Sequence, residues 1–482
     1  MRISEYLKLN KTQRELDFVD IDIINDTPLF IDPFLISKRI DKWSKDTHSS
    51  INNFFQYLIS TVKAGDIKGA KNLFDYLREP KETGLGLSQG NKEGKGMGDS
   101  DTDRIFEKLI NSKAIQSGLV EDLEDTVIFV EKIGPDKVSD MTTNIIRKHL
   151  VEYTQRQCKL LNIPLTADVP SGYFWNRKTM EWEQEHCDFL IIKGHKVLLV
   201  PKAIVCFKPS YTPQTYHQHF ILNFLQSDHL RRNTGLVQTV VNRKGHVRKF
   251  VTKKSLKEKE APFDKSYIRK FTIKNPSILE AYKKSANAIT KPLDLKAFED
   301  FNLTEFCDFL INRLQSIKYG NNSASEYHDL MIGLLDFLFY PELVCPQKEE
   351  RIHDGRKRID ITFDNAAEQG FFFQLHQVKK IPCPYIIIEC KNYKEDLKNP
   401  EIDQLSSRFA PNRGQFGIIA CRQLDNEELF LKRCRDTYYD QRELVLFVTD
   451  VDITTSLEEY KKSNKTALHS ILSNRMRKVF MS

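Results

Sequence analysis

The sequence lacks the features that would place the protein in a membrane or outside the cell. No apolar run approaches the roughly 20 residues that cross a bilayer, and residues 1–8 lack the apolar core of a signal peptide. The nine cysteines are scattered without a Cys-X-X-Cys pair, which argues against a structural zinc site and fits reduced thiols. We therefore expect a cytoplasmic protein that has no membrane partner.

The sequence also lacks a strong charge imbalance. Its net charge is only +7 over 482 residues, which permits nucleic-acid binding but does not indicate it. An apolar fraction of 40%, with 31 Phe and 17 Tyr, is enough to build folded cores, and the length predicts two or three domains. We place an N-terminal domain over residues 1–285 and a C-terminal domain over residues 295–482.

No phosphate-binding loop is found, although glycines gather between residues 84 and 98. A P-loop needs Gly, four residues and then Gly-Lys-Ser/Thr, whereas Gly94-Lys95 is followed by Gly96. A flexible loop is the preferred interpretation, and anion binding before a predicted helix over 101–117 is the alternative. No methyltransferase or helicase motif is apparent either.

The N-terminal region alternates acidic and apolar residues. Residues 15–36 break at Asn25-Asp26-Thr27-Pro28, a pattern typical of a hairpin of two strands. We expect its acids on the solvent face rather than in a metal site; they are Asp17, Asp20, Asp22, Asp26 and Asp32. Two helices over 50–78, a helix capped by Ser139-Asp140 and short strands over 188–207 complete a larger N-terminal α+β domain.

A basic stretch closes this domain. Residues 231–274 contain fourteen Lys and Arg residues, with Phe250, Tyr267 and Phe271 among them. Basic and aromatic side chains together suit the backbone and the bases of a nucleic acid. A solvated, charged linker is the alternative, because residues 253–262 have almost no apolar side chains.

Two apolar runs in the C-terminal domain carry charged residues. Residues 384–392, Pro-Tyr-Ile-Ile-Ile-Glu-Cys-Lys-Asn, predict a buried strand that ends in a carboxylate and an amine. Because side chains alternate along a strand, Glu389 and Lys391 share a face about 7 Å apart, and Cys390 points away, which leaves its carbonyl available. Asp360 lies in a second alternating run, on the face opposite to its apolar side chains.

These residue types suit the hydrolysis of phosphodiester bonds. Hard divalent cations prefer carboxylate and carbonyl oxygens, and Asp360, Glu389 and the Cys390 carbonyl would be such ligands for Mg²⁺, or for Mn²⁺ in its place. Lys391 would position the attacking water or stabilise the developing negative charge. The alternative is an ordinary ion pair between Glu389 and Lys391 at the end of a strand.

The same residues resemble the PD-(D/E)xK nuclease superfamily, which has the restriction-endonuclease-like fold. Asp360 matches the family's Asp, Glu389 its Glu and Lys391 its Lys. Glu326, in a predicted amphipathic helix, is similar to a further acid of the family, and Gln404 is similar to its common helical Gln, which would orient the water or Lys391. The resemblance covers about residues 300–455 and implies a C-terminal α/β sandwich with a metal held by Asp360, Glu389 and Cys390.

The C-terminal domain is expected to begin with helices over 303–318 and 325–340. Strands near 357–363, 371–378 and 384–390 follow, then the helix with Gln404 and strands over 415–421 and 444–448. The 28 residues between Asp360 and Glu389 exceed a tight hairpin, so a strand or loop around 371–373 has to be accommodated. Three arginines are expected near the site, as phosphate contacts or as surface residues: Arg408, Arg413 and Arg422.

Together these features predict an Mg²⁺-dependent endodeoxyribonuclease whose N-terminal domain senses, recruits or oligomerises. A nuclease core joined to a large unrelated domain is similar to bacterial restriction or anti-phage defence proteins, and the defence role and its partner proteins rest on that analogy alone. An RNA nuclease of the same fold is one alternative. A nucleic-acid-binding or assembly protein without catalysis is the other, against which the intact Asp360, Glu389 and Lys391 argue.

Overall fold

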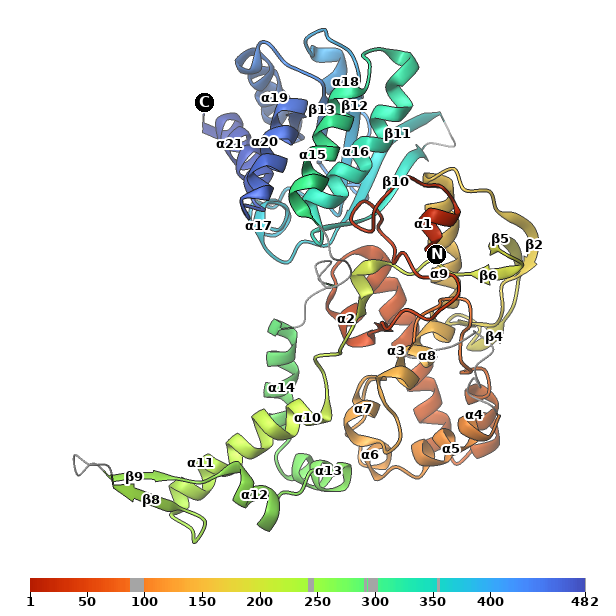
Figure 1. The fold of residues 1–482 in the computed structure, drawn as a ribbon, viewed down its shortest axis with the longest axis vertical. Coiled ribbons are helices and arrows are strands. Elements are labelled where there is room, and N and C mark those ends of the chain that lie inside the picture. The colour runs from red at the N-terminus through yellow and green to blue at the C-terminus, as the bar shows by residue number, and fades with distance from the viewer. Residues whose placement is uncertain (87–98, 242–246, 290–292, 294–301, 353–355, 482) are drawn as a thin grey trace.

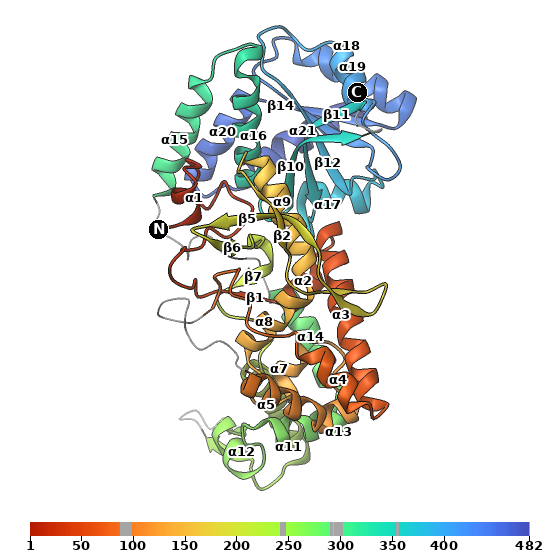
Figure 2. The same cartoon turned by 90° about the vertical axis from the view of Figure 1, so that its right-hand side faces the viewer.

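A computed structural model describes residues 1–86, 99–241, 247–289, 293, 302–352 and 356–481. The glycine-rich segment from residue 87 to 98 and most of the expected domain boundary at 285–300 lie outside these residues. The chain has a mixed α/β structure, and its C-terminal sheet lies at one end of an elongated molecule (Figures 1 and 2). None of the helices within the described ranges has the length and apolar content needed to cross a membrane.

The buried apolar side chains form two clusters. One is built from residues 3–293 together with Val344, Cys345 and Ala366. The other is built from residues 306–479 together with Leu160 of the N-terminal part. Each cluster therefore includes a few side chains from the other half of the chain, so the two halves pack against each other.

Helices dominate the first 160 residues. They are α1 (Ile3–Tyr6), α2 (Pro33–Lys38), α3 (Lys42–Lys63), α4 (Ile67–Phe74), α5 (Asp99–Ile110), α6 (Lys113–Gln116), α7 (Asp125–Phe129), α8 (Pro135–Ile145) and α9 (Arg147–Leu160). The two helices predicted over 50–78 are confirmed as α3 and α4, and Phe54 and Phe55 of the predicted apolar stripe are fully buried.

The predicted cap at Ser139-Asp140 is wrong. Helix α8 begins four residues earlier at Pro135, because proline's fixed φ suits the first helical position. Ser139 lies inside α8, where its Oγ accepts the backbone N–H of Ile31 at 2.9 Å. The helix then ends at Ile145, and α9 begins at Arg147.

Short strands follow in the N-terminal part. They are β1 (Phe30–Ile31), β2 (Thr166–Pro170), β3 (Phe174–Asn176), β4 (Glu181–Glu183), β5 (His186–Ile192), β6 (His195–Val197) and β7 (Val205–Cys206). Strands β2, β5 and β6 form one antiparallel sheet, and β1 pairs with β7.

The hairpin predicted over 15–36 is wrong, because β1 pairs with β7 from more than 170 residues further along the chain. Asp17, Asp20 and Asp32 are buried rather than on a solvent face. Each has polar partners that compensate for burial: Asp20 accepts hydrogen bonds from the N–H and Oγ of Ser4, and Asp32 caps α2 through the N–H of Phe34. Alternation alone does not reveal such partners.

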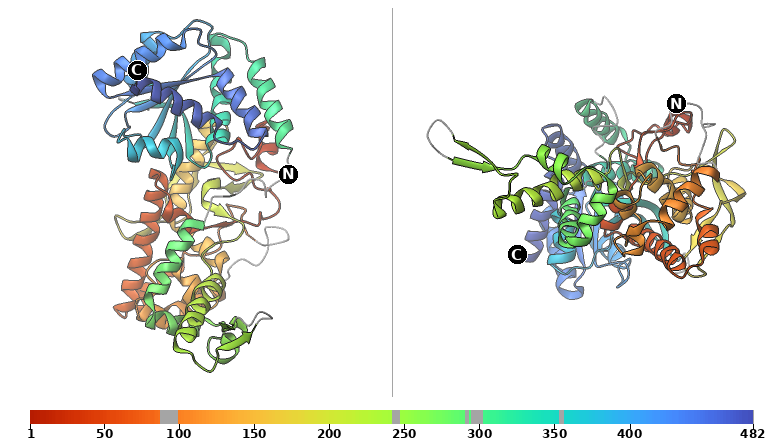
Figure 3. Two further views of the ribbon diagram at one scale, coloured as in Figure 1. Left: turned by 90° about the vertical axis from the view of Figure 1, so that its left-hand side faces the viewer. Right: turned by 90° about the horizontal axis from the view of Figure 1, so that it is seen from below.

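The basic stretch folds into an arm, defined here as residues 213–241 and 247–289. It contains α10 (Pro213–Tyr216), a π-helical turn (His217–Ile221), α11 (Leu222–Arg232), β8 (Gln238–Val241), β9 (Val247–Phe250), α12 (Lys253–Lys259), α13 (Lys265–Lys274) and α14 (Pro276–Ile289). The alternative of a solvated linker is wrong, because residues 253–259 form α12. Figures 1 and 3 show the β8–β9 hairpin projecting from the body.

The C-terminal half contains a five-stranded mixed sheet in the order β10–β11–β12–β13–β14. Its strands are β10 (Leu343–Ile352), β11 (Lys357–Asn365), β12 (Tyr385–Lys391), β13 (Phe416–Cys421) and β14 (Leu444–Thr449). The first two pairings are antiparallel and the last two are parallel. Strands β12, β13 and β14 are almost wholly buried, as continuous apolar runs predict.

Helices cover both faces of this sheet. They are α15 (Leu303–Ser316), α16 (Ala324–Phe339), α18 (Asn399–Ser406), α19 (Glu427–Gln441), α20 (Asp450–Lys461) and α21 (Ala467–Met481). Figure 2 shows α15, α16 and α20 on one side of the sheet and α18 and α19 on the other. This layering places Gln404 of α18 over the strand that ends in Glu389 and Lys391.

The strand predicted over 371–378 is wrong. Residues 370–378 are helical, as α17 (Gly370–Phe373) and a π-helical turn (Gln374–Val378), and the buried Phe371 and Phe372 rings pack against Phe416. The third antiparallel strand is instead β10, whose sequence does not show the apolar pattern of a strand. A register shift between Val344 and Gln347 and a positive φ at Cys345 interrupt its alternation.

Candidate functional site

Asp360 and Glu389 meet where the β11–β12 pairing ends. Ile361 and Ile388 are the last residues to pair, and Asp360 and Glu389 are the next residues on the two strands. Opposite residues of antiparallel strands project from the same face, so both carboxylates face one side. Lys391, two residues along β12, faces the same side.

Beyond the last paired residues, the Asp360 carboxylate, rather than a backbone carbonyl of β11, accepts a hydrogen bond from β12. Its Oδ2 accepts the backbone N–H of Cys390 at 3.0 Å. Because the N–H and C=O of one strand residue point to the same neighbour, the Cys390 carbonyl faces the Asp360 side as well. This placement agrees with the predicted use of that carbonyl as a ligand. The Cys390 thiol is buried, and burial raises its pKa well above the usual value, so it stays protonated.

Glu389, Lys391 and Gln404 form a closed hydrogen-bonded group. Glu389 Oε1 accepts the Lys391 ammonium at 3.0 Å and also accepts the Gln404 side-chain N–H. Gln404 Oε1 in turn accepts the Lys391 ammonium at 2.8 Å. The helix α18 therefore fixes both charged groups of β12 through one amide.

The second oxygen of Glu389 has no partner. Glu389 is 1% exposed, and its Oε2 is buried without a hydrogen bond to any described residue. An unsatisfied buried polar atom costs about 1–3 kcal/mol, and more when it is charged. Burial and the neighbouring Asp360 carboxylate raise the pKa of Glu389, and Lys391 opposes that rise. A cation bound at Oε2 would remove this cost.

The donor set fits Mg²⁺ or Mn²⁺. No group of three or more His, Cys, Asp or Glu side chains among the described residues is placed to hold a metal. A closed zinc site needs such a group, whereas Mg²⁺ keeps several waters and binds through one or two carboxylates and substrate phosphates. Asp360 and Glu389 supply two carboxylates, and the Cys390 carbonyl supplies a further oxygen.

The structure does not bring Glu326 into this group. Glu326 is exposed in the first turn of α16, and none of the described hydrogen bonds or ion pairs joins it to Asp360 or Glu389. Instead, His328 of the same helix places its Nε2 3.9 Å from Asp360 Oδ2. Burial lowers the pKa of His328, and Asp360 opposes the change. No sequence pattern singles out His328, because only folding brings α16 beside β11.

The three predicted arginines have different surroundings. Arg408 Nε is buried without a hydrogen-bond partner among the described residues, and its charge opposes the raised pKa of Glu389. Arg413 donates to the backbone carbonyl of Arg408 at 2.8 Å. Arg422 is a buried residue that pairs with Asp450 at 2.7 Å and lies over the Tyr319 ring. Its interpretation as a surface arginine is wrong.

A cleft of about 620 Å³ continues along this face of the sheet. Thr362 and Ile387, which pair across β11 and β12, lie at its floor, and the N-terminal helices α3 and α9 contribute Lys42 and Arg156 to its walls. Acidic side chains also line it, but burial raises the pKa of one of them, Asp364, to about 8. Asp360 and Glu389 are not among the residues that line the cleft, and the nearest lining residues on their strands are Ile359 and Ile387.

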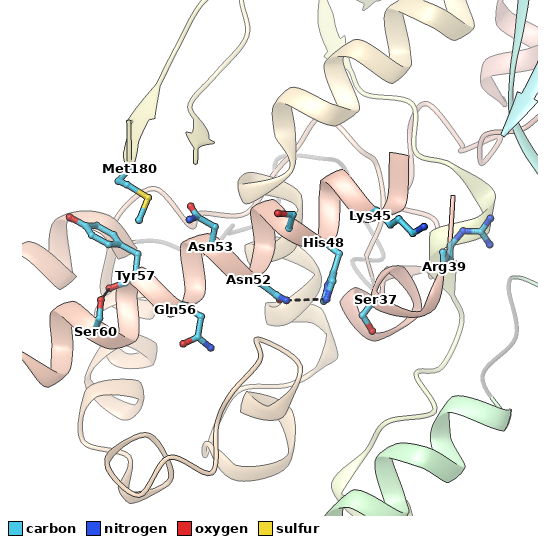
Figure 4. A pocket seen from close by; sticks show the side chains of 11 residues that line it. Ser37, Arg39, Lys45, His48, Asn52, Asn53, Gln56, Tyr57, Ser60 and Met180 are labelled. Atoms are coloured by element: carbon cyan, nitrogen blue, oxygen red, sulfur yellow. Dashed lines mark hydrogen bonds between the residues drawn. The ribbon is translucent and has the colours of Figure 1, made fainter. Parts of the chain in front are cut away.

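A larger groove of about 820 Å³ lies elsewhere, along α3. Figure 4 shows His48, Asn52 and Gln56 along one side of that helix and Met180 beside Tyr57. His48 Nε2 and Asn52 Nδ2 are 3.0 Å apart. The groove is lined by amides, hydroxyls and the basic side chains of Arg39 and Lys45, and no carboxylate of a described residue lines it.

Gln404 gives a first prediction. We expect Gln404→Ala to weaken Mn²⁺ binding about 10- to 100-fold, as the loss of a residue that orients a metal ligand usually does. Isothermal titration calorimetry of the metal-free protein measures this directly. Asp403→Ala, at the exposed neighbouring position on α18, is the matched control and should bind as the wild type does. Equal affinities for all three proteins would contradict the role of Gln404.

The comparisons with known proteins concern the N-terminal part. Residues 8–212 match the model of a family described as a domain of unknown function, DUF8370. No curated protein and no solved structure matches the chain. The family match ends before the arm and the C-terminal sheet, so the site described above is argued from its own geometry.

Proposed function

We propose that the protein is a metal-dependent endonuclease that hydrolyses phosphodiester bonds of DNA. The observation that carries this proposal is the buried, unpartnered Oε2 of Glu389 beside Asp360, with Lys391 held next to it by Gln404. A buried carboxylate oxygen without a partner is costly, and a cation bound at Oε2, beside Asp360 and Lys391, would satisfy it.

The side chains have separate roles in this proposal. Asp360, Glu389 and the Cys390 carbonyl hold the cation. When bound, that cation supplies Lewis-acid chemistry, because it acidifies a water and neutralises charge on the phosphate. An ammonium has three donors, and Lys391 uses two of them on Glu389 and Gln404. Its third donor is then directed at the attacking water or at a phosphate oxygen.

The order of elements supports the proposed restriction-endonuclease-like fold. Helix α16 precedes three antiparallel strands, β10, β11 and β12, and helix α18 leads to the parallel strand β13. This is the order of helix, three strands, helix and strand that the PD-(D/E)xK resemblance implies. The resemblance also favours DNA as the substrate and a role in phage defence in the cytoplasm, with the DUF8370-matching part as a sensing, recruiting or oligomerising module.

Cleavage of supercoiled plasmid, linear DNA and RNA, each with Mg²⁺, Mn²⁺ or EDTA, tests the proposal. We expect nicking and linearisation of the plasmid with either metal and none in EDTA. If RNA is cleaved and neither DNA substrate is, the substrate is RNA and not DNA. If no substrate is cut and calorimetry detects no metal binding that depends on Asp360, the protein is no metal-dependent nuclease.

Metal binding should depend on pH through Glu389. The cation binds the carboxylate form, and the pKa of Glu389 in the free protein is raised above the ordinary value of about 4.3 by burial and by Asp360. We therefore expect Mn²⁺ affinity to be low at acidic pH, to increase as the pH passes the raised pKa, and then to level off. Titrations at several pH values measure this, and a pH-independent affinity would contradict it.

A further inference from the structure

The charge of the protein is concentrated in the arm. The arm contains fourteen Lys and Arg residues and five Asp and Glu residues, a net charge of +9, whereas the whole chain has +7. The remaining residues together therefore carry −2. The arm is therefore strongly basic although the net charge of the whole chain is small. Figures 1 and 2 place the arm at the end of the molecule away from the C-terminal sheet.

Some of these cations hold the arm in place. Lys265 donates to the backbone carbonyl of Val130 at 2.6 Å, and burial lowers its pKa to about 8. Lys283 pairs with Asp125 at 3.0 Å, and Lys253 stabilises the arm internally by donating to the carbonyl of Gln218 at 2.7 Å. These contacts give the arm a defined position, so its other cations are presented by a folded surface.

The other cations face solvent on neighbouring elements. Helix α11 packs against α12 and β9, and His229 of α11 lies 2.7 Å from Glu260, the residue after α12. Six exposed cations from these elements define the arm patch: Arg231, Arg232, Arg248, Lys254, Lys257 and Lys259. Arg231 and Arg232 pair only with Asp228 in the described structure, and exposed pairs of this kind are worth little. A polyanion can displace them.

One aromatic residue of the basic stretch, Phe263, is exposed, and its ring packs edge-on against His217; the other three are buried or half-buried. Phe271 is buried, and Tyr267 stacks on it with ring centroids 6.3 Å apart. Phe250 is half-buried at the end of β9. Single-strand-binding surfaces present aromatic rings to unstacked bases, whereas this surface presents cations and a two-stranded β-ribbon, which fits the major groove of a duplex.

We propose that the arm patch binds the phosphate backbone of duplex DNA, without sequence preference, at a place separate from the candidate active site. The choice of DNA rests on the proposed function, but the binding itself needs neither the metal nor cleavage. Contacts to phosphates release counterions, so the affinity must fall steeply with salt. The arm would then hold the substrate while the C-terminal site acts elsewhere on it.

Fluorescence anisotropy with a labelled 30-base-pair duplex in EDTA tests this, because no cleavage occurs there. The test variant combines Arg248→Gln, Lys254→Gln, Lys257→Gln and Lys259→Gln. The control removes the same charge from exposed lysines outside the arm, by Lys63→Gln, Lys68→Gln, Lys178→Gln and Lys432→Gln. Unchanged melting temperatures show that both proteins are folded.

We expect the arm variant to bind at least about 10-fold more weakly at 0.1 M salt. The slope of log K against log salt should become shallower by about 3.6, because the variant neutralises four fewer phosphates and each contributes about 0.9. The control should bind like the wild type. Equal weakening in both variants, an unchanged arm variant or a wild type that does not bind would overturn the proposal.

Binding of single-stranded DNA and of anionic vesicles is measured as well, to distinguish duplex DNA from these two other partners. Tighter binding of the single strand, weakened equally in the arm variant, would overturn the duplex assignment. Val240 and Val247 are exposed on the ribbon, so vesicles with phosphatidylserine serve as an alternative anionic surface. Vesicle binding that depends on the arm patch, together with DNA binding that does not, would overturn the proposal in favour of a membrane.

Discussion

Replacing Asp360 with Asn is expected to lower metal-dependent DNA cleavage by about 10³-fold or more. The substitution removes one of two carboxylates that would bind the cation, and the charge stabilisation that a bound metal supplies is worth several kcal/mol, of which each 1.4 kcal/mol is a factor of about ten in rate. The Asn side-chain oxygen can still accept the N–H of Cys390, so the end of the β11–β12 pairing is retained.

The same assay applied to Lys391→Ala should give a similar loss for a different reason. Lys391 is not a metal ligand, so this variant should still bind Mn²⁺ in calorimetry, whereas Asp360→Asn should not. The matched control is Asp308→Asn, which removes a half-exposed acid of α15 that pairs with Lys461. Cleavage that survives both Asp360→Asn and Lys391→Ala would contradict the assigned site, and a loss in the control would point to misfolding.

The second large effect is expected at Lys202, which joins the two halves of the chain. Lys202 is fully buried, and its ammonium pairs with Asp336 of α16 and lies 4.5 Å from the centre of the Tyr340 ring. Asp17, nearby, accepts the Tyr153 hydroxyl at 2.7 Å and the N–H of Cys345 at 3.2 Å. Asp17 and Lys202 of the N-terminal half thus lie in one buried network with Asp336, Tyr340 and Cys345 of the C-terminal half.

We expect Lys202→Ala to lower the free energy of unfolding by about 3–5 kcal/mol at pH 8, the usual cost of removing one member of a buried ion pair. Burial raises the pKa of Asp336 to about 6, and Lys202 opposes that rise. Without Lys202 the pKa increases further. A carboxyl with a raised folded-state pKa favours the folded state at low pH and loses that contribution as the pH rises through this pKa, so the defect should be smaller at pH 5.

Denaturant unfolding at both pH values measures the effect, with circular dichroism for the whole chain. Tryptophan fluorescence reports on the N-terminal half, because all three tryptophans, Trp43, Trp175 and Trp182, lie there. Lys202→Met combined with Asp336→Leu is the control, since removing both charges leaves no unpaired acid at α16 and should restore much of the loss. A Lys202→Ala protein whose stability at pH 8 matches that of the wild type would contradict this account.

Local sequence was informative wherever the chemistry follows from neighbours along the chain. The run 385–391 forms β12 as predicted, and strand alternation correctly places Glu389 and Lys391 on one face with Cys390 on the other. Gln404 lies on a helix, as expected, and reaches both of them. These features depend on the two-residue period of a strand and on helix propensity, which short segments carry by themselves.

Long-range pairing was not predictable in the same way. Strand β10 was missed because a register shift interrupts its pattern, and residues 371–378 became helical because their phenylalanines pack against Phe416 from β13. His328, rather than Glu326, lies beside Asp360. In each case the deciding contact comes from residues distant in the chain.

The sequence by itself determined the chemical inventory of this protein: the strand ending in Glu389 and Lys391, the acid at Asp360, and a basic stretch after residue 230. Only the tertiary structure decided that Glu389 keeps an unpartnered oxygen, that Lys202 pairs with Asp336, and that the basic stretch is a folded arm. The physical reason is that burial and charge pairing depend on which distant segments meet, whereas strand and helix periods depend on residues a few positions apart.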